Sequence, residues 1–365
     1  MSKSLLFIPD ISGYTQFVQT TEIEHSQHVI AELLEVLISA NTENLELAEI
    51  EGDALFFYLE NAIPSQERLL ALIESMFTAF YSHLKKFETH RICPCNACAT
   101  APNLKLKIIA HSGTLQHLEV LGQRKPFGQE VIQAHRLLKN SIESDNYVLI
   151  SRALALEIQL LYSYSSKLYR FRKGKDEYDG KSIEYLYALI ETDKLSLLEV
   201  PPIKSISFEF PPKLTATRSY PISAQALYEQ IANFDKRINW VKGVYEFRHN
   251  RNEVNRQGTT HQCVIDGKTL DFITVVKPVE ASQLVFGELT KSLPFADEVY
   301  HFYIFDPIDT HSCSLRIEVY WKADSPFKKM AIALFAKRVL RTNLQKTLNW
   351  LEDYLDQNLI RTSSP

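Results

Sequence analysis

The sequence contains no long apolar run. Its first apolar stretch, residues 5–8, is followed directly by a proline and an aspartate. No later stretch approaches the roughly 20 apolar residues that a membrane-spanning helix needs. A secretory leader also needs a longer apolar core than this N-terminus provides. We therefore expect neither membrane insertion nor secretion, and we predict a cytoplasmic location.

An excess of basic charge is also missing. The 40 Lys and Arg residues are outnumbered by 44 Asp and Glu residues, which gives a formal net charge of -4. A protein that binds nucleic acid through its phosphates normally carries a basic patch or a basic overall charge. This charge balance disfavours DNA or RNA as a partner.

Cysteine is scarce. The chain has five cysteines, an odd number, and most of them are clustered in residues 93–98. A secreted disulfide framework usually has an even number of cysteines in a short chain. Reduced thiols in a reducing compartment fit this pattern better.

The length of 365 residues exceeds what a single hydrophobic core usually supports, and a hydrophobic content of 45% is enough for two cores. Proline pairs at 201–202 and 211–212 bracket a short segment, and paired prolines favour an extended backbone over a helix. We predict a first domain at 1–200, a proline-rich linker at 201–212 and a second domain at 213–360.

Two aspartates stand beside glycines at predicted strand ends. The segment Phe-Ile-Pro-Asp-Ile-Ser-Gly-Tyr-Thr at 7–15 places Asp10 at the end of a buried strand, before Gly13 permits a tight turn into a helix. The segment Glu-Gly-Asp-Ala at 51–54 places Asp53 in a turn that leads into another strand. Both carboxylates could share a metal site, although aspartate beside glycine is also common in ordinary turns.

These two segments resemble the class III nucleotidyl cyclase domain, whose first strand carries F-x-D-I-x-G-[FY]-[TS] and whose next hairpin carries G-D. The resemblance implies a ferredoxin-like α/β sandwich, in which Asp10, Ile11 and Asp53 hold two Mg²⁺ or Mn²⁺ ions. In that family the ions activate the ribose 3′-hydroxyl and clamp the triphosphate of a bound nucleoside triphosphate.

Two further positions correspond to residues that read the purine in this family. Glu49 precedes Gly52 by three residues, and a glutamate there can accept hydrogen bonds from the N–H groups of guanine. Lys125 occupies the second position and departs from the residue types expected there. A solvated strand charge is an equally good account of Glu49, so the choice between ATP and GTP stays open.

Residues 125–137 resemble the cyclase segment G-x-x-V-N-x-A-x-R-[LM]. The alignment places Arg136 on the arginine that offsets charge at the reacting phosphate, acting from the partner subunit of a homodimer. Ile132 replaces the asparagine that orients the ribose. Slow catalysis, a changed substrate, and nucleotide binding without turnover are therefore all open.

Residues 90–98 hold the densest set of soft metal ligands in the sequence. His90, Cys93, Cys95 and Cys98 match a tetrahedral zinc site in number and type. Their spacing is not that of a standard zinc finger, because a second Cys-x-x-Cys pair is missing. Reduced thiols without a metal and a redox sensor are the alternatives. This segment is expected as an insertion between a helix and a strand.

The sequence of the second domain predicts a strand, a short helix, six strands in hairpin order and a long final helix. With its opening P-I-S-A-x-x-L-Y-E-x-I-x-N, it resembles the helix-grip fold of the SRPBCC or START-like superfamily. In that fold an antiparallel sheet wraps a long C-terminal helix and encloses an apolar cavity, which implies a small hydrophobic ligand. A purely packed interior is the alternative, and no catalytic set stands out.

The final helix is predicted to bury one apolar stripe. The stripe consists of Phe327, Met330, Leu334, Leu340, Leu344, Leu348, Leu351 and Leu355.

The sequence thus predicts an α+β protein with a cyclase-like domain followed by a helix-grip domain. The predicted function is a signalling protein that forms a cyclic nucleotide and pyrophosphate by two-metal catalysis. The alternative is a degenerate cyclase homologue that binds a nucleotide, a metal or a hydrophobic ligand without turnover.

Overall fold

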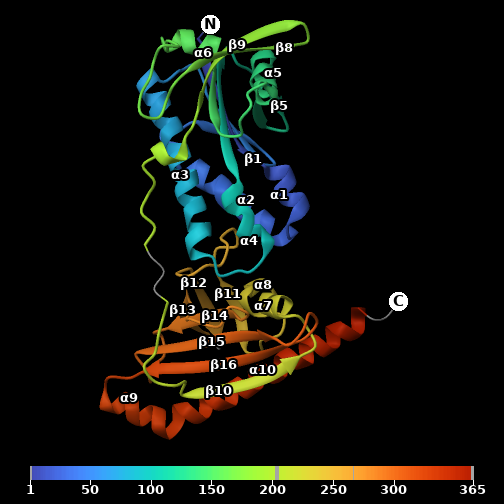
Figure 1. Cartoon of the computed structure of the whole chain (residues 1–365), viewed down its shortest axis with the longest axis vertical. Coiled ribbons are helices and arrows are strands. Elements are labelled where there is room, and N and C mark those ends of the chain that lie inside the picture. Colours follow the sequence, from blue (N-terminus) through green and yellow to red (C-terminus); the bar gives the residue numbers. More distant parts are fainter. Residues whose placement is uncertain (1, 202–204, 266, 363–365) are drawn as a thin grey trace. The chain divides into compact units, whose positions relative to one another are not determined.

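The computed structural model describes residues 2–201, 205–265 and 267–362 (Figure 1). The chain divides into two compact units. The first contains Met1–Glu88 and Asn96–Pro201, and the second contains Thr89–Cys95 and Pro202–Pro365. Residues 202–204 of the predicted linker lie outside the described residues.

The first unit is built on a seven-stranded sheet with the order β2-β3-β1-β4-β7-β9-β8. Strands β4 and β7 are parallel, and the other neighbouring strands are antiparallel. A separate hairpin of β5 and β6 follows β4. The strands are β1 (Ser4–Ser12), β2 (Glu46–Glu51), β3 (Ala54–Leu59), β4 (Lys105–Gly113), β5 (Gln116–Val120), β6 (Gln123–Phe127), β7 (Tyr147–Ser151), β8 (Arg172–Tyr178) and β9 (Lys181–Leu189).

Apolar periodicity explains the central elements of this unit. Residues 5–8 are fully buried because β1 lies between β3 and β4, which confirms the predicted buried strand. The apolar stripe of the long helix α3 is buried as well, from Leu69 to Phe87. The helices are α1 (Tyr14–Thr20), α2 (Ile23–Ser39), α3 (Gln66–His90), α4 (Asn96–Thr100), α5 (Gln129–Arg136) and α6 (Arg152–Glu157), with short 3-10 turns η1 (Ala101–Asn103), η2 (Leu137–Lys139) and η3 (Thr192–Lys194).

Helix α5 covers part of one face of the sheet. Its Ala134 and the following Leu137 pack in one cluster with Leu6, Ile8 and Phe56 of the strands. Side chains alternate between the two faces of a strand, so Leu6 and Ile8 share this face. The packing fixes α5 over Leu6 and Ile8 in the middle of β1.

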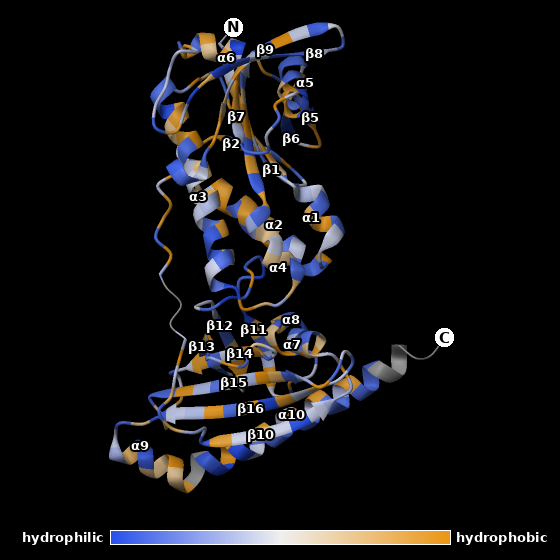
Figure 2. Cartoon of the chain, viewed as in Figure 1, coloured by the Kyte–Doolittle hydropathy of each residue, from blue (hydrophilic) through white to orange (hydrophobic). Residues whose placement is uncertain are grey.

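The second unit is a seven-stranded antiparallel sheet with the order β10-β16-β15-β14-β13-β12-β11. Figure 2 shows hydrophobic and hydrophilic residues following one another along β15 and β16, as expected for a sheet with two different faces. The strands are β10 (Leu214–Tyr220), β11 (Val244–Arg248), β12 (Thr260–Ile265), β13 (Lys268–Val275), β14 (Leu284–Thr290), β15 (Glu298–Pro307) and β16 (Cys313–Lys322).

Residues just before β10 cover one face of this sheet. Ile206, Phe208 and Phe210 pack against a cluster that contains Tyr300 and Tyr320. The ring of Phe208 stacks on Tyr320 with a centroid distance of 3.9 Å. Part of the predicted linker 201–212 is therefore packed onto the second unit.

The C-terminal helices carry an unexpected change of face. Leucines of α10, from Leu340 to Leu355, are buried as predicted, but Phe327, Met330 and Leu334 are 78%, 56% and 62% exposed. The prediction of one continuous buried stripe is wrong because a π-helical turn separates the two parts and shifts the helical register. The helices are α7 (Ala224–Ala232), α8 (Phe234–Arg237), α9 (Pro326–Ala331), the π-helix η4 (Ile332–Ala336) and α10 (Lys337–Thr362).

The antiparallel sheet and the long final helix of the predicted second domain are thus present. Helix α10 packs against β10, as Figure 1 also shows. Assignment of this unit to the helix-grip superfamily remains a prediction. In the described part of the chain, no helix has both the length and the apolarity needed to cross a bilayer.

Candidate functional site

A cleft of about 330 Å³ opens at the end of β1. It collects both aspartates that the sequence singled out, together with a lysine and a third carboxylate. Its lining residues are Asp10, Ile11, Ser12, Gly13, Tyr14, Thr15, Gln16, Asp53, Lys107 and Asp145.

Strand pairing places the two aspartates together. Asp10 lies opposite Ala54 in the β1–β3 ladder, one residue from Asp53. The backbone N–H of Ile11 donates a hydrogen bond of 3.1 Å to the carbonyl oxygen of Asp53. Gly13 has a φ of 90°, which favours glycine and starts α1 directly after the strand. The turn that follows Asp10 and the turn that contains Asp53 therefore bring the two carboxylates into one cleft.

Both aspartate carboxyl groups of the cleft have raised pKa values. Burial, and then the negative charge of Asp10, raise the pKa of Asp53 to about 6. Burial also raises the pKa of Asp10, although the neighbouring ammonium of Lys107 acts in the opposite direction. Two like charges in a partly desolvated place disfavour each other's ionisation. A bound divalent cation would remove this penalty.

Lys107 is a residue of this cleft that the sequence analysis missed. Its Nζ lies 3.4 Å from Asp10 Oδ1, because β4 pairs with β1 so that Lys107 faces Asp10 across the ladder. Asp145 lines the same cleft from the turn before β7. The alternation of lysine and apolar residues at 104–108 predicts a strand but cannot reveal its pairing register.

The residues present fit a hard divalent cation. Carboxylate oxygens are the ligands that Mg²⁺ and Mn²⁺ prefer, and Asp10 and Asp53 supply them, with Ile11 next to both. Lys107 is a competing cation at the same carboxylate. The arrangement could therefore hold a divalent ion or bind a polyphosphate through its lysine.

Glu49 and Lys125, the predicted purine readers, contact each other. Lys125 Nζ lies 3.1 Å from Glu49 Oε1, and both side chains are about half exposed. The structure therefore brings together two positions 76 residues apart in sequence. Such an exposed pair contributes roughly 0–1 kcal/mol to stability. Their role in purine recognition remains a prediction.

Arg136 and Ile132 both lie on α5. The guanidinium of Arg136 forms an ion pair with Asp179 of the β8–β9 turn, and Ile132 is 53% exposed. On the same helix, Glu130 contacts the buried His111, whose ring also contacts the hydroxyl of Ser151 at 2.8 Å. His111 therefore has a structural role, because these contacts connect β4 to α5 and to β7.

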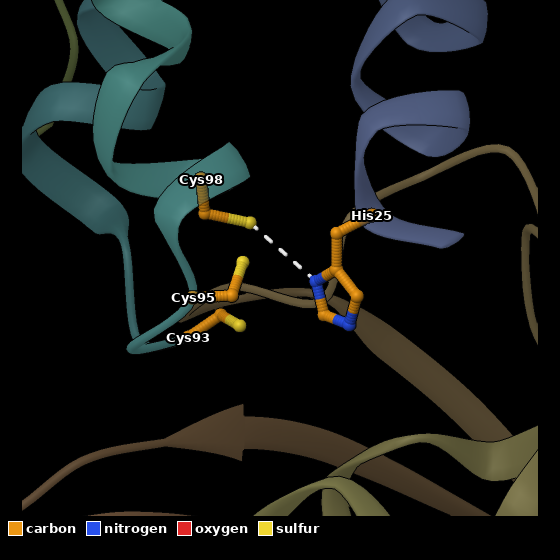
Figure 3. A group of neighbouring side chains, drawn as sticks. All are labelled: His25, Cys93, Cys95 and Cys98. Atoms are coloured by element: carbon orange, nitrogen blue, oxygen red, sulfur yellow. Dashed lines mark hydrogen bonds between the residues drawn. The ribbon is translucent and has the colours of Figure 1, made fainter. Parts of the chain in front are cut away.

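A second group of potential ligands contains His25, Cys93, Cys95 and Cys98 (Figure 3). Its four ligand atoms all lie within 4.8 Å of one another, and Cys98 Sγ is 3.7 Å from His25 Nδ1. The group contains His25 in place of the predicted His90. No local pattern in the sequence connects His25 to cysteines about 70 residues later, and a histidine in the first turn of a helix is commonly an exposed residue without a ligand.

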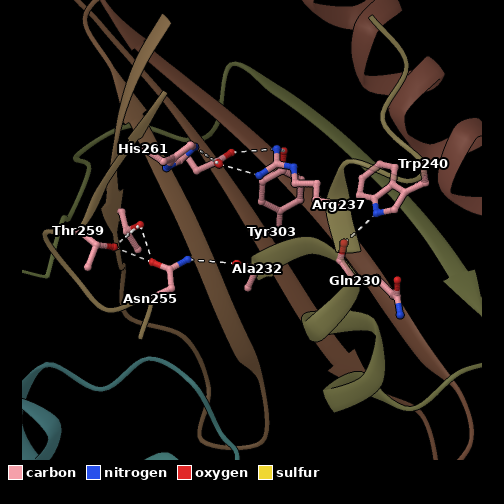
Figure 4. A network of polar contacts seen from close by, with 10 residues as sticks. Gln230, Ala232, Arg237, Trp240, Asn255, Thr259, His261 and Tyr303 are labelled. Atoms are coloured by element: carbon pink, nitrogen blue, oxygen red, sulfur yellow. Dashed lines mark hydrogen bonds and ion pairs between the residues drawn. The ribbon is translucent and has the colours of Figure 1, made fainter. Parts of the chain in front are cut away.

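Buried polar residues of the second unit form a network that the sequence also did not indicate (Figure 4). Arg237 donates hydrogen bonds of 2.6 and 3.1 Å to the two oxygens of Glu288 and one of 3.0 Å to the Tyr303 hydroxyl. His261 Nε2 lies 3.1 Å from Glu288 Oε1. Burial alone would raise the pKa of Glu288, but the charge of Arg237 holds it well below its usual value.

This ion pair differs from the acidic cleft because its charges are matched within the protein. Glu288 and Arg237 are both buried, and the bidentate contact satisfies both carboxylate oxygens. Burial lowers the pKa of the nearby His301 to about 4. We assign the network to the internal stabilisation of this unit.

Comparison with known families gives a limited match. The family model described as "Protein of unknown function (DUF2652)" matches residues 30–147. "Uncharacterized protein Rv2561/Rv2562" from Mycobacterium tuberculosis is 29% identical over 129 residues, which are 34% of this chain and 58% of that protein. The chain thus spans little more than half the length of this curated relative.

Comparison with solved structures finds class III adenylyl and guanylyl cyclase domains over about half of the chain. The adenylyl cyclase CyaB from P. aeruginosa has 16% sequence identity and a TM-score of 0.39, and the match covers 52% of this chain and 94% of that one. The guanylate cyclase domain of RhGC from Catenaria anguillulae, solved in complex with GTP, has 15% identity and a TM-score of 0.37, with 52% and 97% covered.

Proposed function

We propose that the first unit is a class III nucleotidyl cyclase-like signalling domain that acts on a nucleoside triphosphate. In this proposal Asp10 and Asp53, with Ile11 beside them, hold two Mg²⁺ or Mn²⁺ ions. The observation that carries the proposal is the cleft that brings Asp10 and Asp53 together, where burial, and then the charge of Asp10, raise the pKa of Asp53 to about 6. Two neighbouring, partly buried carboxylates disfavour each other's ionisation, and a divalent cation bound between them would offset that cost more fully than Lys107 does.

The surrounding residues have roles that suit this chemistry. Divalent ions supply charge stabilisation to an in-line displacement at phosphorus and help to ionise the attacking hydroxyl. Lys107, next to Asp10, places a positive charge where a polyphosphate would lie. Glu49 and Lys125 would contact the purine, and Arg136 would act on the phosphates from the partner subunit of a homodimer.

An activity assay tests this proposal. The purified chain is incubated with Mn²⁺ or Mg²⁺ and with ATP or GTP, and pyrophosphate and cyclic nucleotide are measured. We expect product from the wild type and at least a roughly hundredfold loss for Asp10→Ala, because that change removes a metal ligand. Asp193→Ala, on an exposed turn and not among the residues that line the cleft, is the matched control. Equal product from the wild type and Asp10→Ala would contradict the proposal.

A second candidate function is nucleotide binding without turnover. Ile132 offers no amide to orient a ribose, which removes on the order of a hundredfold in rate. Arg136 is held by Asp179 of its own chain instead of standing unpaired. Calorimetry would show heat of binding for a triphosphate with Mg²⁺ but no product in the assay above. Absence of any nucleotide binding would exclude both candidates.

For the second unit we propose a small hydrophobic ligand held between the sheet and α10. The proposal rests on the resemblance of this unit to the helix-grip fold, and the buried leucine row of α10, which packs against β10, would supply the apolar wall of the site. Mass spectrometry of an organic extract of the purified protein would detect a co-purifying ligand. A well-packed interior that excludes added apolar probes would contradict the proposal.

A further inference from the structure

We propose that His25, Cys93, Cys95 and Cys98 form a structural zinc site that fastens the connection between α3 and α4 to the beginning of α2. This inference is independent of the nucleotide chemistry above. It rests on four donor atoms that converge although about 70 residues of sequence separate His25 from the three cysteines.

Geometry and burial support four-coordinate binding. All four ligand atoms lie within 4.8 Å of one another. Tetrahedral zinc with Zn–S bonds of about 2.3 Å requires sulfur atoms roughly 3.8 Å apart, which this spacing can meet with small side-chain movements. The three cysteine side chains are buried, and His25 is partly exposed. In Figure 3 the three sulfur atoms and the His25 ring point toward a common centre.

A separate contact holds the backbone in place. The side chain of Glu22 accepts hydrogen bonds from the backbone N–H groups of Asn96 and Ala97, at 3.1 and 3.0 Å. Glu22 directly precedes α2, whose first turn carries His25, and Asn96 begins α4, which carries Cys98. The carboxylate therefore fixes two ligand-bearing elements against each other without using any ligand atom. Such support is typical of preorganised metal sites.

The ligand set selects the class of metal. Thiolates are soft ligands and bind zinc far better than Mg²⁺, which prefers oxygen. Three thiolates and one neutral imidazole complete a tetrahedron, so no position is left open for water or substrate. A closed site of this kind is structural. The guanidinium of Arg91 donates a 3.3 Å hydrogen bond to the backbone carbonyl of Cys93, which helps to hold that ligand-bearing segment in place.

The identity of the histidine ligand, His25 and not His90, can be tested directly. The purified full-length chain is analysed for metal by mass spectrometry, and we expect one zinc per chain. His25→Ala should weaken zinc retention against a competing chelator at least roughly tenfold. Even the loss of a residue that only hydrogen-bonds to a metal ligand costs that much in metal affinity. His25→Cys should retain zinc, since a fourth thiolate also completes the tetrahedron. His90→Ala is the matched control and should keep zinc fully.

A spectroscopic measurement covers the case in which His25→Ala folds poorly. Cobalt substituted into the wild type should give tetrahedral bands with thiolate charge transfer, and His90→Ala should give the same spectrum. Cys98→Ser should alter that spectrum, whereas Cys313→Ser, a buried cysteine outside the group, should not. Metal-free purified protein that neither takes up zinc nor gives these cobalt bands would overturn the proposal. So would zinc lost from His90→Ala but kept by His25→Ala.

This test is separate from the test of the cyclase proposal. Zinc content and cobalt spectra do not depend on turnover, and Asp10→Ala should leave both unchanged. A protein with zinc and no product would therefore refute the cyclase and leave the zinc site standing.

Discussion

Two carboxylates of this protein, one partly buried and one fully buried, have pKa values shifted in opposite directions. Asp53 lies beside Asp10, and its pKa is raised to about 6, whereas Glu288 is gripped by Arg237 and its pKa is lowered. Burial disfavours ionisation in both places. The difference is the matching charge, which the second unit supplies internally and the first unit supplies only in part, through Lys107. Burial alone therefore does not single out a candidate site, whereas burial with only partly matched charge singles out Asp10 and Asp53.

The largest expected effect comes from breaking the matched pair. Arg237→Met should lower the free energy of unfolding by about 3–5 kcal/mol, because it leaves Glu288 buried without its counter-charge. The double variant with Glu288→Leu should recover much of this loss, since two apolar side chains need no counter-charge. Urea denaturation measures both.

Arg248→Ala is the control for that experiment. Its pair with Glu246 spans 2.8 Å, but both side chains are more than half exposed, so the loss should be roughly 0–1 kcal/mol. Equal losses for Arg237→Met and Arg248→Ala would show that the buried network is not the stabilising contact described here.

The stability of the protein should depend on pH and on metal through Asp10 and Asp53. The pKa of Asp53 is raised from 3.8 to about 6 in the folded protein, so the folded state binds more protons than the unfolded state in this interval. The stability of metal-free protein should therefore fall as pH rises through this window. At pH 7, Asp53→Asn should stabilise the metal-free protein by on the order of 1 kcal/mol after solvent screening.

When a divalent metal is bound, we expect the wild type to be more stable than Asp53→Asn, the opposite of the order expected without metal. Saturating Mg²⁺ or Mn²⁺ should raise the melting temperature of the wild type at pH 7 and should raise that of Asp53→Asn much less, since binding to the native state stabilises it. Asp193→Asn, on an exposed turn, should behave as the wild type in both experiments. If metal shifts both cleft and control variants equally, the ion binds elsewhere.

The smallest effect is expected at Glu49 and Lys125. Lys125→Ala should change the free energy of unfolding by less than about 1 kcal/mol, because the ion pair is exposed. If these residues read the purine, the same variant should change the preference between ATP and GTP in a binding assay. An unchanged preference would leave them as ordinary surface charges.

Much of the fold follows from local patterns. The buried run 5–8, the stripe of α3 and the strands of the second unit were predictable because apolar periodicity reflects burial. The stripe of the final helix failed at Phe327, Met330 and Leu334, since a π-helical turn changes the face without altering the spacing that suggests a stripe.

The candidate sites divide in the same way. Asp10 and Asp53 could be found because each lies in a short segment with glycine at a turn, and those segments resemble a known family. Lys107 could not, because its place beside Asp10 depends on the register of β1 with β4. Arg237 and Glu288 meet across 51 residues, and no local pattern connects them.

The amino-acid sequence by itself determined the order of strands and helices, the two aspartate turns and the cluster of cysteines, because each is written within a few neighbouring residues. The tertiary structure alone decided which histidine faces the thiols, which lysine faces Asp10 and which arginine neutralises Glu288. Those partners come from distant parts of the chain, and only strand register and helix packing bring charges and ligand atoms within the few ångströms at which they act.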